Sequence, residues 1–156
     1  MKITAKLSAK SLRKAAAELR AYKKRVEELP EKLVTELASQ GAQIALVEAK
    51  DIRDTGNLLS SIVGEAGGKI GYVKCKCGYA VFVEFGTGVV GSGKPHPDLS
   101  ILGWKYDVNG HGDLGWWYPG NDGKLHWTRG MPSRPFMFNT AQQLRQLVIP
   151  TAKMLL

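Results

Sequence analysis

The sequence predicts an α+β fold in which long N-terminal helices and a C-terminal helix pack on a small, mostly antiparallel twisted sheet. Three observations lead to this class. Apolar residues recur at helical spacing over about the first fifty positions, strand-like runs fill the region from 62 to 85, and a second helical pattern lies near the end. With 156 residues, 44% of them apolar, the chain is expected to form a single domain, residues 1–156, with its own core.

The N-terminal region is expected to hold a short strand followed by two helices. Lys2 to Leu7 alternates polar and apolar residues, as a strand does, and Ser8 suits the N-cap of a following helix. Pro30 is expected to end or kink that helix and to open a second one that runs to about Lys50. The first helix carries one apolar stripe, made of Leu12, Ala15, Leu19, Tyr22, Val26 and Leu29.

Three strands are expected in the middle of the chain, at Ile62 to Ala66, Lys69 to Cys77 and Tyr79 to Phe85. The links between them are short and contain glycine, which is typical of antiparallel neighbours. The third run is almost wholly apolar, so we expect both faces of that strand to be covered. It ends abruptly in the turn Gly86-Thr87-Gly88.

Residues 88–130 are expected to form an inserted β-hairpin arm, because they hold most of the glycines and every tryptophan of the chain. Short strands are predicted within this insert at residues 104–106, 116–118 and 125–128. A final helix is predicted from about Phe138 to Ile149, where Pro150 interrupts the pattern.

The positive charge is concentrated at the N-terminal end. Residues 1–25 hold nine Lys or Arg and one acid, whereas residues 26–156 hold thirteen of each sign. Such a segment is typical of contact with nucleic acid or an acidic protein surface, and equally of a solvated helix face. The candidate contacts are Lys2, Lys6, Lys10 and Lys14. No apolar run approaches the roughly 20 residues of a membrane helix, so neither a membrane span nor a signal peptide is expected.

Three sequence runs follow one another between the N-terminal helical segment and the final helix. They are Thr55 to Ile62, then Tyr79 to Thr87, which ends in Val-Glu-Phe-Gly-Thr, and then Pro132 to Ala141, with Pro-Phe-Met at its centre. In this order and spacing the chain resembles the head–tail joining, or tail-completion, proteins in the neck of long-tailed bacteriophages. It departs from that pattern in the long Trp-rich insert before Pro132.

The resemblance implies a structural virion protein with no enzymatic activity and no cofactor. It implies a homo-oligomeric ring, expected to be sixfold, at the head–tail junction, assembled in the cytoplasm of the bacterial host. Its partners would be the head connector or stopper and the tail terminator or tail-tube proteins. Two alternatives remain open: a tail terminator that caps the tail tube, and a non-specific DNA-binding module that uses the basic N-terminal segment near the packaged DNA.

The residues do not favour a metal site or a catalytic site. Cys75 and Cys77 lack the spacing of a structural zinc site and are expected to be reduced thiols. The segment from Asp107 to Asp113 begins like a calcium loop but lacks its carboxylate count. The run Gly91 to Lys94 lacks the first glycine and the following helix of a phosphate-binding loop. Glu84 is a candidate buried acid with no partner evident in the sequence, so a hydrogen-bonding role in the sheet or ring is expected.

Two groups of residues are the predicted ring or neck contacts. The first group is the end of the second run, Glu84, Phe85, Gly86 and Thr87. The second is the four tryptophans of the insert, Trp104, Trp116, Trp117 and Trp127. The tryptophans could instead form a small local core, but a Gly-rich insert has little interior in which to bury four indoles. Contact with another chain is therefore favoured.

Overall fold

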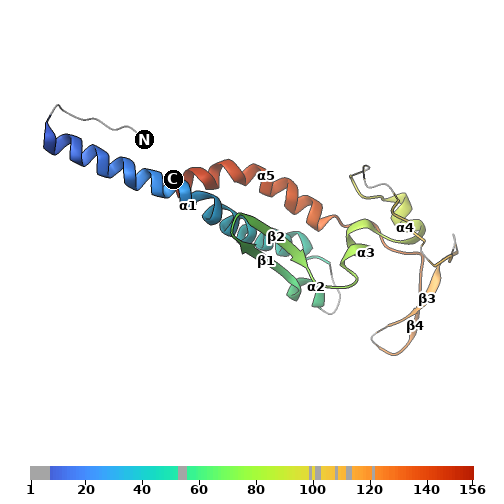
Figure 1. Ribbon diagram of the computed structural model, residues 1–156. Coiled ribbons are helices and arrows are strands. Elements are labelled where there is room, and N and C mark those ends of the chain that lie inside the picture. Colours follow the sequence, from blue (N-terminus) through green and yellow to red (C-terminus); the bar gives the residue numbers. More distant parts are fainter. Residues whose placement is uncertain are drawn as a thin grey trace.

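The computed structural model describes residues 8–52, 56–98, 100, 103–107, 109–111, 114–120 and 122–156. It confirms the α+β class: a long helix at the N-terminal side, a second long helix at the C-terminal side, and two small antiparallel sheets of two strands each (Figure 1). The strand predicted from Lys2 to Leu7 lies outside the described residues.

The N-terminal helices are one continuous helix, α1 (Ala9–Ala49), so the predicted break at Pro30 is wrong. The Ser8 hydroxyl caps its start by accepting a hydrogen bond from Ser11 N at 3.2 Å. Pro30 removes one main-chain hydrogen bond, and the strong helix formers on both sides carry the helix through it. The buried residues of α1 all lie in its second half and are small: Ala38, Gly41, Ala45 and Ala49.

One hairpin packs against this second half of α1. It consists of β1 (Ile62–Gly67) and β2 (Ile70–Cys75), which pair antiparallel after the short helix α2 (Asn57–Ser60). Gly64 lies directly on the helix, because an added Cβ there would collide with the main-chain carbonyl of Ala38. Small residues on both sides thus let the helix and the sheet approach closely.

The third predicted strand is instead a helix. Residues Ala80–Phe85 form α3, and Gly88–Gly93 form α4 after the turn at Thr87. The buried members of α3 are Ala80, Val83 and Glu84, spaced as one helical face. A short run that is almost wholly apolar carries no period, so the sequence pattern could not separate a buried strand from a buried helix.

The last third of the chain contains a second hairpin and the final helix. Strands β3 (Trp116–Pro119) and β4 (Leu125–Thr128) pair antiparallel, as predicted for two of the three insert strands, whereas Trp104 to Tyr106 form no strand. Helix α5 (Phe136–Leu155) is longer than predicted and continues through Pro150.

Helices α1 and α5 lie side by side and run antiparallel (Figure 1). Two polar contacts show this direction: Gln143 donates to Glu48 at 2.7 Å, and Thr151 donates to Gln40 at 3.4 Å.

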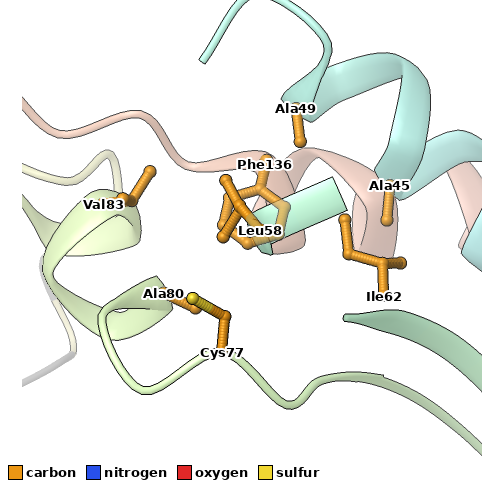
Figure 2. Close-up of a cluster of buried hydrophobic side chains, with 8 residues drawn as sticks. All are labelled: Ala45, Ala49, Leu58, Ile62, Cys77, Ala80, Val83 and Phe136. Atoms are coloured by element: carbon orange, nitrogen blue, oxygen red, sulfur yellow. The ribbon is translucent and has the colours of Figure 1, made fainter. Parts of the chain in front are cut away.

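The core gathers residues that are far apart in the sequence, as Figure 2 shows. Leu58 and Phe136 are its largest fully buried side chains, at 1% and 2% exposure. Around them lie Ala45, Ala49, Ile62, Cys77, Ala80 and Val83. Each of the three runs that carry the resemblance contributes to this core, which brings segments far apart in the sequence together.

Candidate functional site

Glu84 connects two of the runs that carry the resemblance, Tyr79 to Thr87 and Pro132 to Ala141. Its side chain, 7% exposed, reaches from α3 to the first turn of α5, where Oε2 accepts a hydrogen bond from Met137 N at 2.9 Å. Oε1 accepts one from Phe138 N at 2.8 Å. The residue before the helix, Pro135, has no side-chain acceptor to offer these amides. A carboxylate also suits the positive end of a helix dipole, so Glu84 acts as a distant N-cap of α5.

His96 completes this buried polar contact. Its Nε2 lies 3.2 Å from Glu84 Oε1, and its Nδ1 accepts a hydrogen bond from Asp98 N at 3.1 Å. Because Nδ1 is an acceptor, the ring proton is assigned to Nε2, and a neutral His96 donates to Glu84. The imidazole also packs against Phe85 and Phe138, with centroids 4.8 and 5.2 Å away.

The turn that follows α3 fixes the insert to the body. Thr87 exchanges two main-chain hydrogen bonds with Met131, at 2.9 and 3.1 Å. Gly86 has φ of +79°, and a Cβ there would lie 2.6 Å from Ser133 N. Both the left-handed conformation and the close main chain therefore require glycine at this position. The two ends of the insert are held next to each other.

The four tryptophans divide into two pairs, which refines their prediction as one contact group. Trp104 packs on Phe85 at 5.0 Å between centroids, and its Nε1 donates to the Gly86 carbonyl at 3.1 Å. Trp116 is half-buried and stacks on His111 at 4.8 Å. Trp116 thus packs within the insert, whereas Trp104 packs the insert against α3 and the turn that follows it.

Trp117 and Trp127 lie on the exposed hairpin. They stand opposite each other on β3 and β4, with ring centroids 5.4 Å apart and exposures of 61% and 49%. Pro119 and Leu125 form the next pair on the same face, two residues along each strand. We call these four residues the hairpin apolar face. All four are exposed and apolar, which is unusual for a face that contacts only water.

The tip of this hairpin is held in place by Asp122. Its Oδ1 accepts hydrogen bonds from His126 Nε2 at 2.9 Å and from Lys124 N at 3.1 Å. The hydrogen bond from His126, followed by that from Lys124 N, holds the pKa of the Asp122 carboxyl below its usual range. The hairpin therefore presents its apolar face on an ordered support.

The remaining candidates lie apart from this region. Lys10 and Lys14 are exposed on the first half of α1, and Lys2 and Lys6 lie outside the described residues. Cys77 is a buried free thiol, and Cys75 is a free thiol 3.1 Å from Ser61 Oγ. Over the described ranges, no cluster of three or more His, Cys, Asp or Glu is placed to hold a metal ion. The same part of the chain contains no helix able to span a membrane.

The sequence pattern does not predict the partners of Glu84 or the role of His96. A signal for the first was present, because a helix that begins directly after Pro135 needs an acceptor from elsewhere. No such signal identified His96. Comparison of the chain with protein-family models, curated proteins and solved structures found no match.

Proposed function

We propose that this chain is a structural protein of the phage neck, which forms a homo-oligomeric ring that completes the tail and joins it to the head connector. One observation carries the proposal: the two most distinctive runs of the resemblance form a single structural unit. Glu84 of the one run caps the helix that begins in the other, with hydrogen bonds of 2.9 and 2.8 Å. The resemblance implies that these two runs mark the fold, and runs that mark a fold are expected to contact each other within it.

The hairpin apolar face is the proposed contact with a neighbouring chain. Aromatic residues dominate the binding energy of protein interfaces, and an ordered support reduces the entropy lost on binding. Trp117 and Trp127 meet both conditions. Glu84, Phe85, Gly86 and Thr87 belong to the same proposal, as the residues that hold the insert in position behind this face.

The test is assembly with the neck partners. We expect light scattering to detect a ring when the chain is mixed with the head connector and the tail-tube protein of the same phage. The double variant Trp117→Ala/Trp127→Ala should weaken that assembly at least about thirtyfold, as expected for the loss of an interface hot spot of roughly 2 kcal/mol. Ile70→Ala, which removes another exposed apolar side chain on β2, is the matched control.

The outcome separates the neck role from its nearest alternative. Assembly on the tail tube alone, with no affinity for the connector, would identify a tail terminator. A chain that joins neither partner, while remaining folded, would contradict the proposal.

A DNA-binding module is the second candidate, favoured by the basic first half of α1. Lys10, Arg13 and Lys14 are exposed there. Non-specific binding to duplex DNA would weaken steeply with salt, with a logarithmic slope of about −0.9 for each phosphate contact. The variant Lys10→Glu/Lys14→Glu should then reduce both affinity and slope, whereas unchanged binding would exclude this role for the segment.

A further inference from the structure

The first hairpin covers α1 but leaves α5 without a strand. Gly64 of β1 lies against the main chain of Ala38, and Gly71 of β2 lies against that of Val34. Helix α5 lies beside α1 in the same layer, yet no strand of the described part of the chain lies beside β2 on that side. The run expected to supply a third strand, Tyr79 to Phe85, forms α3 instead.

An apolar groove marks the position of the missing strand. It has a volume of about 340 Å³ and lies between β2 and the two long helices. From α5 it is lined by Met137, Ala141 and Leu144, which share one face of that helix. From α1 it is lined by Val34 and Leu37. A strand placed beside β2 would bury the side chains of its inner face in this groove.

The main chain of β2 is ready to pair with such a strand. Lys76 N donates to Ser61 O at 3.0 Å, so every second residue before Lys76 directs its main-chain groups toward β1. The alternate residues Gly71, Val73 and Cys75 direct theirs to the free edge. No group in the described part of the chain forms a main-chain hydrogen bond with these three residues. A free edge of this kind is a template for another strand.

One segment of the chain has the length and the pattern to occupy the groove. Residues 1–7 are the longest stretch outside the described ranges, and every other such stretch has at most three residues. Residues 2–7 read Lys-Ile-Thr-Ala-Lys-Leu, which alternates polar and apolar as a half-buried strand does. Its apolar members are Ile3, Ala5 and Leu7.

This segment cannot reach the groove of its own copy. The groove begins level with Val34, which lies about 39 Å along the unbroken helix α1 from Ser8. An extended chain from Ser8 back to Lys2 spans at most about 22 Å. Whichever way the segment runs from Ser8, it stops well short of β2. The groove that it occupies must therefore belong to a second copy.

We propose that residues 2–7 of one copy add as a third strand to the free edge of β2 in another copy. Main-chain hydrogen bonds to Gly71, Val73 and Cys75 hold the strand, and its apolar face enters the groove over α5. Its two lysines stay on the outer face, in water. Each copy gives one segment and accepts one, so the contact closes as a ring or as a reciprocal pair. This inference does not rest on the neck function.

The first experiment is sedimentation equilibrium of the full chain alone, without an N-terminal tag. We expect association that increases with concentration, and Ile3→Asp should raise its dissociation constant at least about tenfold by placing a charge in the groove. Thr4→Asp is the matched control, because the adjacent residue lies on the outer face of the strand. A chain that stays monomeric, or equal effects of the two variants, overturns the proposal.

The second experiment changes the groove. Ala141 is exposed and lines it, so Ala141→Lys should weaken association as Ile3→Asp does. Gln146→Lys adds the same charge on the opposite side of α5 and should leave association unchanged. Association that survives Ala141→Lys but is lost in Trp117→Ala/Trp127→Ala would belong to the hairpin apolar face. That result overturns this inference and leaves the proposed function standing.

Hydrogen exchange of single amides then identifies the pairing itself. The amides of Gly71, Val73 and Cys75 should exchange rapidly in dilute samples and at least about tenfold more slowly once most of the chain is associated. The amides of Tyr72 and Lys74, which face β1, should be protected in both states. Association without added protection at the free edge overturns strand addition. Circular dichroism of each variant separates these outcomes from unfolding.

Discussion

The two halves of α1 belong to one unbroken helix yet have opposite environments. The second half buries Ala38, Gly41, Ala45 and Ala49 against the first hairpin and α5, whereas the first half exposes Leu12 and Leu19. Small residues allow the main chains of neighbouring elements to approach closely. One helix thus packs small residues against the body in its second half and leaves large apolar side chains exposed in its first half.

The same contrast separates the two hairpins. The hairpin β1–β2 lies with Gly64 against the Ala38 main chain, while β3–β4 exposes the indoles of Trp117 and Trp127. In both comparisons the body is built from close main-chain contacts and the projecting parts from exposed large side chains. We therefore expect the largest losses of stability from changes at the close main-chain contacts of the body, and small losses from changes at exposed side chains.

The largest effect is expected where β1 meets α1. Gly64→Ala would place a Cβ within collision distance of the Ala38 carbonyl, and neither main chain can move without disturbing the core. We expect the free energy of unfolding to fall by about 3 kcal/mol, measured by urea denaturation. Gly67→Ala, in the same strand but with open space around the added Cβ, should change it by less than about 1 kcal/mol. Equal losses in the two variants would contradict the close packing.

A smaller effect is expected from the charge of Glu84. Glu84→Gln keeps one acceptor oxygen but removes the negative charge at the start of α5 and turns an amide group toward Met137 N or Phe138 N. We expect a loss of about 1–2 kcal/mol in the free energy of unfolding. Glu31→Gln changes an exposed acid in the middle of α1 and should leave the free energy of unfolding almost unchanged. Equal stability of the two variants would mean that Glu84 does not cap α5.

The N-cap of α1, Ser8, should stabilise the first turn of the helix without changing the global stability of the protein. Ser8→Ala removes the acceptor of Ser11 N at the start of α1, a contact worth about 0.5–1 kcal/mol to that helical turn. In dilute samples we expect hydrogen exchange of the first-turn amides to accelerate about two- to fivefold, while exchange near Ala45 is unchanged. A shift of the global unfolding midpoint by a comparable free energy would mean that the two halves of α1 unfold together.

The fold class could be predicted from the sequence because its main signals are local. In α1, in the strands of both hairpins and in α5, apolar residues recur at the short spacing of a helix or a strand. The run from Tyr79 to Phe85 is a helix and not the predicted strand, because a run that is almost wholly apolar has no period by which the two can be separated. Pro30 and Pro150 were expected to break helices. A proline costs a limited free energy, which long flanking helices compensate.

The candidate site could be predicted only as a set of residues. Glu84 was named correctly as a buried acid, but its partners Met137 and Phe138 lie more than fifty positions away, and nothing local identifies them. The four tryptophans are predicted as one contact group only because they lie in the same insert. Their division into an inward pair and an exposed pair depends on strand register and on Phe85 and His111, which the sequence does not specify.

The smallest effect is expected from the exposed charges on the body. Hydrogen bonds from Lys74 and Lys76 lower the pKa of Glu65 from its ordinary value near 4.5 to about 2. Because the folded pKa is depressed, the contribution is present above the ordinary pKa and is lost as pH falls toward about 2. The Glu65 side chain is 41% exposed, so solvent and salt screen the pairing, and Glu65→Gln should shift the unfolding midpoint less than Gly64→Ala or Glu84→Gln does. The difference from the unmodified chain should vanish near pH 2 and at high salt. A difference that persists under both conditions would assign the effect to packing, and would show that the outer face of the first hairpin contributes to the body as its inner face does.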